Sequence, residues 1–263
     1  MTADATIGEA AQAASLADRL TRAKARSVMI CTPVARNPVW QYTGSLASTL
    51  LFLPEHGIRV TYQFVVGSSV ISKARNELCA HFLMSDCTDL LFIDDDMQWS
   101  PNSVLRLLAS DKPLIGGVGR MRVQKPNSDP AVWCWRPIHD QNGQLRQDDM
   151  GAIEAKGFGA AFMLINRRVL HELATAHPEW KRPGANDWPQ DLRDNYFEFF
   201  RQNHEGEEGE ASEDYVFCDR WRRHGQSVWV DPTIQLGHVG SWNYQGSLED
   251  AVLVAAEPTE QAA

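Results

Sequence analysis

Three consecutive carboxylates, Asp94, Asp95 and Asp96, directly follow the apolar run LLFI at residues 90–93. Four apolar residues in a row are typical of a strand buried in a parallel sheet, and ligands bind at the carboxyl ends of such strands. Like charges gathered there are costly unless a cation compensates for them. Alternate residues of an extended segment point the same way, so Asp94 and Asp96 could together hold Mg²⁺ or Mn²⁺. The triplet predicts a metal site that serves a phosphate, with a solvated turn as the alternative.

Two later segments carry groups that could complete such a site. His238 comes just after a predicted strand, between glycines in the run LGHVG, and imidazole binds Mn²⁺ alongside carboxylate. Ser212, Glu213 and Asp214 begin a predicted helix, where a serine caps and acids are favoured by the helix dipole. Capping by Ser212, together with the helix dipole that favours the acids, would explain these three residues without catalysis. The catalytic interpretation makes Asp214 a general base facing an acceptor hydroxyl and Glu213 a group that binds or orients that acceptor.

Cationic and polar side chains near the strand ends suit a nucleotide. Arg75 could neutralise a diphosphate and Asn76 could bond to a base or ribose, although an exposed helical arginine is the plain alternative. Thr32, Pro33 and Arg36 follow the first predicted strand and suit a loop that holds the nucleotide.

An aromatic and basic segment suggests an acceptor surface. Trp133 and Trp135 lie among five basic residues between positions 111 and 136. Aromatic rings next to cations stack on sugars, and equally on nucleic-acid bases. Packing of an edge strand is the alternative interpretation of both tryptophans.

Apolar runs alternate with helical patterns through the first half of the chain. This alternation predicts an α/β fold with a mostly parallel, doubly wound central sheet flanked by helices. Ser72 and Ser100-Pro101 are predicted helix starts. The predicted strands lie at residues 27–31, 60–66, 90–93, 114–115, 160–165 and 227–230, and further helices at 46–53, 167–176 and 212–224.

Length and composition indicate one large domain. The 263 residues are 43% hydrophobic and 22% charged, and the net charge of −9 argues against a surface devoted to nucleic acid. We expect a single domain at 27–246, an N-terminal helix or arm at 1–26 and an acidic, partly disordered tail at 247–263. Residues 202–211 are predicted to form a mobile loop that closes over a donor.

Cysteine usage and hydropathy predict a cytoplasmic location. The five cysteines form no CxxC pair, which favours buried free thiols in a reducing compartment. No apolar run approaches the roughly 20 residues of a membrane span. The N-terminus lacks the pattern of a secretory signal.

Together these motifs resemble the GT-A glycosyltransferases, in particular small bacterial and phage members related to family 2, over roughly residues 28–246. Asp94, Asp95 and Asp96 resemble the DxD motif, which holds the metal and the donor diphosphate. The run SEDY at 212–215 resembles the xED motif, whose aspartate is the base in inverting members. The resemblance further matches His238 to a late metal-binding histidine and the run ARN at 74–76 to a donor-site element, and places Gly157, Phe158 and Gly159 on the acceptor side.

The resemblance implies sugar transfer from a nucleotide-diphosphate donor, a UDP-sugar rather than a GDP-sugar, with Mn²⁺ or Mg²⁺ as cofactor. The acceptor stays open between a glycan, a lipid-linked sugar and a hydroxymethylated base of phage DNA. A nucleotidyltransferase acting on sugar phosphates and a non-catalytic nucleotide-sugar binding module are the alternatives. The former should show a Gly-rich basic loop after the first strand, where this chain has Thr32-Pro33-Val34.

Overall fold

Residues 16–122, 132–202, 212–250 and 252 are described by the computed structural model of the protein. The expected arm before residue 16, the expected loop after residue 202 and most of the expected tail lie outside these residues. The described helices are α2 (Leu16–Ala23), α3 (Trp40–Glu55), α4 (Ile71–Met84), α5 (Pro101–Ala109), α6 (Arg167–Ala176), α7 (Gln190–Asp194) and α8 (Glu213–Arg223), with a 3-10 turn, η1, at Pro178–Trp180.

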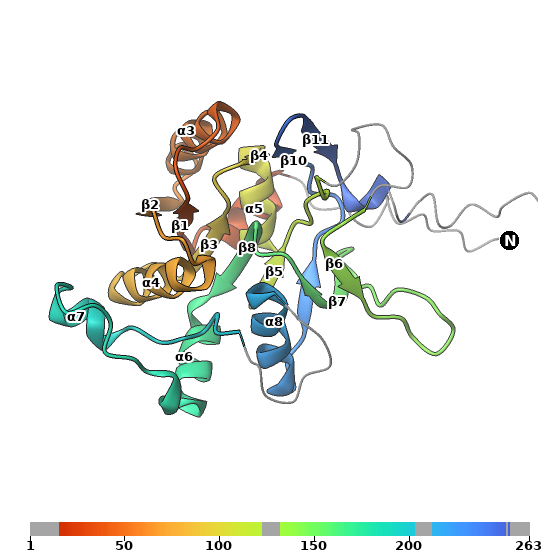
Figure 1. Ribbon diagram of the computed structural model, residues 1–263. Helices are drawn as coiled ribbons and strands as arrows, with labels where there is room; N and C mark the ends of the chain where they lie inside the picture. The colour runs from red at the N-terminus through yellow and green to blue at the C-terminus, as the bar shows by residue number, and fades with distance from the viewer. Residues whose placement is uncertain (1–15, 123–131, 203–211, 251, 253–263) are drawn as a thin grey trace, which may run out of the picture.

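The strands form two sheets (Figure 1). The larger sheet has eight strands in the order β2-β1-β3-β8-β5-β9-β7-β6, and the smaller has the order β11-β10-β4. The strands are β1 (Ser27–Val34), β2 (Arg59–Val66), β3 (Asp89–Ile93), β4 (Met97–Trp99), β5 (Leu114–Gly116), β6 (Trp135–Pro137), β7 (Ile153–Phe158), β8 (Phe162–Asn166), β9 (Val228–Val230), β10 (Leu236–Val239) and β11 (Asn243–Gly246).

Most strands of the large sheet run in one direction. β1 pairs in parallel with β2 and β3, and β5 pairs in parallel with β9. β8 is antiparallel to β3 and β5, and β7 is antiparallel to β9 and β6. Six of the eight strands therefore share a direction, with β8 and β7 reversed. The predicted α/β class and mostly parallel sheet are confirmed.

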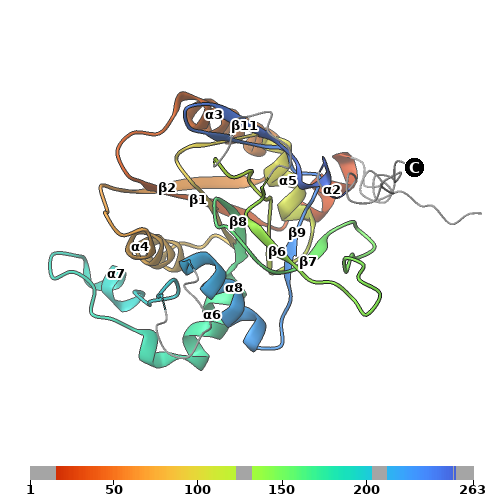
Figure 2. The ribbon, with the colours of Figure 1, turned by 45° about the vertical axis from the view of Figure 1, so that its right-hand side comes forward.

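Helices cover both faces of this sheet, as Figure 2 shows. On one face α4, α6 and α8 pack into a core cluster that contains Leu90 and Phe92 of β3. On the other face α2, α3 and α5 pack into a second cluster that contains Leu91 and Ile93. Because β3 is buried on both faces, its residues 90–93 are all apolar. The aspartate triplet begins directly after Ile93, the last residue of this buried strand.

The sequence signals predicted some helix ends correctly and others wrongly. Ser100 caps α5 as predicted, since its hydroxyl accepts a hydrogen bond from the Asn102 N–H at 3.3 Å. Ser72 does not cap α4, which begins at Ile71 after an uncapped Val70. Helix α3 begins at Trp40, earlier than the predicted residue 46. No described helix has both the length and the apolar character that a membrane span requires.

Candidate functional site

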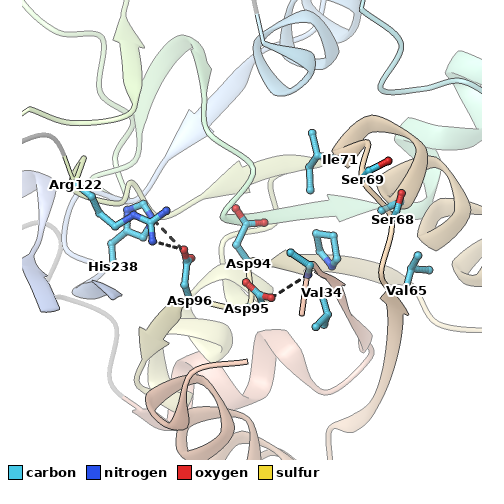
Figure 3. A pocket seen from close by; sticks show the side chains of 13 residues that line it. Val34, Val65, Ser68, Ser69, Ile71, Asp94, Asp95, Asp96, Arg122 and His238 are labelled. Carbon is cyan, nitrogen blue, oxygen red and sulfur yellow. Dashed lines mark hydrogen bonds and ion pairs between the residues drawn. The ribbon is translucent and has the colours of Figure 1, made fainter. Parts of the chain in front are cut away.

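A cavity of about 410 Å³ opens at the carboxyl ends of β1, β2 and β3 (Figure 3). This is the edge of the sheet at which the sequence predicted a ligand site. The aspartate triplet, Arg122 and His238 form its charged wall, while apolar and hydroxyl side chains line the rest. The remaining lining residues are Pro33, Val34, Ala35, Val65, Ser68, Ser69, Ile71 and Ala74.

The three aspartates follow β3 in a turn and point to three different partners. The Met97 N–H donates to the Asp94 carbonyl at 3.1 Å, which closes the turn. Figure 3 shows Asp96 directed at His238, Asp95 at the loop after β1, and Asp94 away from both. The expectation that Asp94 and Asp96 share one side of an extended segment is therefore wrong, because the chain turns before Asp96.

Asp96 and His238 form the part of the site best suited to a metal. The His238 Nδ1 atom lies 2.9 Å from the Arg120 carbonyl oxygen, so Nδ1 carries the proton that it donates. The other ring nitrogen, Nε2, faces Asp96 Oδ1 at 3.5 Å. That oxygen is buried and has no hydrogen-bond partner among the described residues. An imidazole nitrogen and a carboxylate oxygen are both ligands of divalent cations such as Mn²⁺, and a backbone carbonyl behind the ring is the usual support of a histidine ligand.

Asp94 takes no part in this pair. Within the described residues no group of three or more His, Cys, Asp and Glu side chains is arranged to hold a metal ion. The Asp94 carboxylate instead bonds to Arg75 at 3.0 Å. Its role as a metal ligand remains a prediction. His238 itself lies inside β10, paired with Met97 of β4, and not after a strand.

Arg75 is a buried bridge between the triplet and α8. Its side chain is 4% exposed, with Nη2 at 3.0 Å from Asp94 and Nη1 at 3.4 Å from Glu213 Oε1. Its guanidinium also lies over the rings of Phe92 and Phe200. The exposed-arginine alternative is wrong. A buried cation between two carboxylates holds the two acidic segments together.

Burial also sets the electrostatics of the two carboxylates that Arg75 joins. Burial raises the pKa of Glu213 above its ordinary value, and Arg75 opposes this rise. The pKa of Asp94 is raised in the same way, again with Arg75 opposing. Arg75 therefore compensates for the charges of two carboxylates of the protein itself.

Asp214 is held at the first turn of α8 by hydrogen bonds to its two oxygens. Oδ2 accepts from the Ala160 N–H at 3.2 Å, and Oδ1 accepts from the Tyr215 N–H at 2.8 Å and from the Ser212 hydroxyl. Ser212 precedes the helix but makes no capping bond to its backbone. Capping therefore does not explain this segment.

Glycines of the β7–β8 segment let α8 approach. A Cβ on Gly159 would lie 3.5 Å from Asp214 Oδ2, and one on Gly157 would lie 3.0 Å from the Tyr215 ring. Phe158 between them is fully buried in the core. Phe158, which the sequence analysis placed on the acceptor side, is therefore a core residue. Gly157 therefore leaves room for Tyr215 of α8, whereas a Cβ on Gly159 would make only an ordinary contact with Asp214.

Of the other predicted binding residues, one lines the cavity, others are buried in the core, and one is exposed outside the cavity. Pro33 lines the cavity, whereas Thr32 is buried and bonds to the Tyr42 hydroxyl at 2.5 Å. Asn76 is buried, and its side-chain oxygen accepts from the Phe200 N–H at 2.8 Å. Arg36 is exposed and is not part of the cavity lining. Trp133 and Trp135 are half-buried and pack against the core, which favours the packing interpretation.

Asp95 and Arg122 have roles that only the structure shows. Asp95 Oδ2 accepts from the Ala35 N–H at 3.2 Å, and its carbonyl accepts from the Val39 N–H at 3.0 Å, so Asp95 holds the loop after β1. Arg122 pairs with Asp96 Oδ2 at 2.7 Å. No pattern in the sequence indicates that Arg122 pairs with Asp96. The run GSS at residues 67–69 marks the end of β2 in the sequence. Because ligands bind at the carboxyl ends of parallel strands, this run is also expected at the cavity.

Comparisons with known proteins give little further information. No protein-family model matches the chain, and no curated protein matches it in sequence. One solved structure with some likeness is a glycosyltransferase involved in the glycosylation of the major capsid of PBCV-1. The superposition covers 65% of this chain and 74% of the other, at 11% identity and a TM-score of 0.30. A score of this size does not establish a common fold.

Proposed function

We propose that this protein transfers a sugar from a nucleoside-diphosphate donor to a hydroxyl acceptor with the help of a divalent metal. The observation that carries the proposal is the pair Asp96–His238, whose Oδ1 and Nε2 atoms face each other across 3.5 Å at the cavity, with Asp96 Oδ1 buried and without a hydrogen-bond partner among the described residues. The cavity volume of about 410 Å³ suits a nucleotide-sized ligand. Pro33, Ser68 and Ser69 supply an uncharged wall opposite the carboxylates.

Asp96 and His238 are the residues that would hold Mn²⁺ or Mg²⁺. Bound there, the metal supplies positive charge to a leaving diphosphate. Carboxylate together with imidazole suits Mn²⁺ in particular. Arg122, which pairs with Asp96, is a second cation at the same wall.

The chain's own residues provide the proton acceptor. Asp214 is proposed as the general base for the acceptor hydroxyl, since both its oxygens are oriented by hydrogen bonds from Ser212, Tyr215 and Ala160. Glu213 is proposed as a positioning residue through its contact with Arg75.

The test is a titration of the full chain by calorimetry with UDP, GDP and their sugar conjugates, with and without MnCl₂. We expect a UDP-sugar to bind only when Mn²⁺ is present, and Asp96→Asn to lose this dependence. Binding that ignores Mn²⁺, or that survives Asp96→Asn intact, refutes the proposed metal and diphosphate site. Products separate the alternatives, because a nucleotidyltransferase releases pyrophosphate from UTP whereas a glycosyltransferase releases UDP.

A further inference from the structure

The two carboxylate oxygens of Asp96 have different partners, and Figure 3 shows both partners on the same side of it. Oδ1 faces the Nε2 atom of His238 at 3.5 Å, while Oδ2 forms an ion pair with the Nη1 atom of Arg122 at 2.7 Å. The Asp96 side chain is only 19% exposed, so its carboxylate needs a compensating positive charge. Arg122 is therefore the counter-ion of the proposed metal ligand.

Arg122 is held at this place by the end of β10. Its Nη1 atom also donates to the Val239 carbonyl oxygen at 2.9 Å, and the Val239 N–H donates to the Asp96 carbonyl oxygen at 2.8 Å. A Cβ on Gly240 would lie 2.9 Å from the Cδ atom of Arg122, so the glycine leaves room for the arginine side chain. The backbone of β10 thus orients both members of the ion pair.

Arg122 is the one lysine or arginine among the described residues that line the cavity. Arg75, which the sequence suggested as the partner of a diphosphate, is 4% exposed and lies between Asp94 and Glu213. Arg122 is 43% exposed, so its guanidinium can exchange partners at the cavity wall. A guanidinium presents a planar fork of donors that matches phosphate oxygens. Of the two arginines, Arg122 is the one that can reach a diphosphate in the cavity.

A divalent metal and Arg122 would compete for the same carboxylate. A metal held by Asp96 and His238 would be close to the guanidinium, and two neighbouring cations repel each other. A diphosphate relieves this repulsion, because it offers negatively charged oxygens to both cations. The metal and the diphosphate would therefore each favour the binding of the other, since linkage between two ligands is reciprocal.

We propose that Arg122 is the diphosphate-binding residue of this site, and that its guanidinium moves from Asp96 to the diphosphate when a divalent metal binds the carboxylate. The proposal rests on the proposed sugar transfer from a nucleoside-diphosphate donor. The guanidinium exchanges one anionic partner for another, so no covalent step is involved. Arg122 thereby couples binding of the metal to binding of the donor.

The test measures two ligands on the full chain, with Arg122→Met as the variant. Electron paramagnetic resonance measures Mn²⁺ binding without nucleotide, and calorimetry measures binding of UDP and GDP at saturating Mn²⁺. We expect Arg122→Met to bind Mn²⁺ at least about 3-fold more tightly, because Asp96 loses a competing cation. We expect the same variant to bind the nucleotide at least about 10-fold more weakly, because charge-assisted hydrogen bonds to the diphosphate are lost.

Two further variants serve as controls. Arg146→Met removes an exposed arginine that pairs with Glu154 and does not line the cavity, so both affinities should stay unchanged. Arg122→Lys keeps the charge but loses the planar fork of donors. It should lie between the wild type and Arg122→Met in both measurements.

The proposal requires that the two affinities change in opposite directions. A fall of both affinities in Arg122→Met would show that the arginine only supports the structure of the site, and this result overturns the proposal. An unchanged affinity for either ligand overturns it as well. A wild-type chain that binds neither Mn²⁺ nor a nucleotide refutes the proposed function and this proposal with it. Mn²⁺-dependent nucleotide binding that Arg122→Met leaves unchanged refutes the role of Arg122 alone.

Discussion

The Nε2 atom of His238 faces the Oδ1 atom of Asp96 across 3.5 Å, while the Arg120 carbonyl holds the other nitrogen of the ring at 2.9 Å. The ring orientation and the tautomer are thereby fixed before any ligand arrives. The two facing atoms can be satisfied by a proton on the imidazole or by a metal ion. Substitution of His238 distinguishes the two cases, because only a metal site would lose affinity for Mn²⁺.

His238→Ala is expected to weaken Mn²⁺ binding at least about 10-fold, because a ligand and its backbone support are lost together. Electron paramagnetic resonance of free Mn²⁺ in a titration measures the affinity. His139→Ala, an exposed histidine, serves as the control and should bind Mn²⁺ as the wild type does. Equal affinity in His238→Ala would show that the pair shares only a proton.

Arg75→Met is expected to destabilise the protein by about 3–5 kcal/mol, because two carboxylates lose their common cation inside the protein. Urea unfolding measures the loss. Arg59→Met is the matched control, since Arg59 pairs with Asp86 at the exposed surface, and such pairs contribute little. Similar effects of the two substitutions would contradict the bridging role of Arg75.

The sequence predicted β3 and the position of the aspartates, because an uninterrupted apolar run has few alternatives. It did not predict that Arg75 would be buried, since an arginine in a helix with polar neighbours resembles a surface residue. The partner that buries it, Glu213, is far away in sequence and meets it only across the folded site. Such a bridge has no local signal.

The small sheet escaped prediction for a related reason. β4 has three residues, Met97–Trp99, which is too short for a periodic pattern to emerge. Its pairing with β10 nevertheless places His238 beside Asp96. The sequence thus predicted which kinds of side chain the site contains. It did not predict the turn that separates Asp94 from Asp96, because that turn depends on β4.

Asp214→Asn is expected to lower turnover by about 10²–10⁴-fold with donor binding unchanged, because the amide keeps one of the two acceptor oxygens but cannot take a proton. Release of UDP in the presence of acceptor measures turnover. Asp219→Asn is the control in the same helix, where Asp219 pairs with Arg223. Unchanged turnover in Asp214→Asn would remove it as the base and favour a binding module.

Gly116→Ala is expected to cost about 1–3 kcal/mol through overpacking. The added Cβ would lie 2.3 Å from the buried Phe158 ring and 2.4 Å from the Phe162 carbonyl oxygen. Gly44→Ala in α3 meets no atom within 4 Å and should stabilise the protein by about 0.5–1 kcal/mol. Thermal unfolding of both variants tests the packing of β5 against β7, and a tolerated Gly116→Ala would contradict it.

Cys134 supplies a pH test of the surroundings of Asp214. It is half-buried, whereas the other four free cysteines are buried. Burial, with further contributions from the charges of Asp214 and Asp94, raises the pKa of Cys134 to about 11. The raised pKa keeps the thiol neutral near pH 8. Iodoacetamide should therefore label the native protein at least about 10-fold more slowly than free cysteine at that pH.

The labelling rate of Cys134 should continue to rise with pH up to about 11, in step with its thiolate fraction. Asp214→Asn should increase the rate at pH 8, because it removes a negative charge that disfavours the thiolate. Cys134→Ser should abolish labelling and so verify that the buried cysteines are shielded. A rate that levels off near pH 8.5, or that ignores Asp214→Asn, would place the thiol away from Asp214 and contradict the arrangement of β7, β8 and α8.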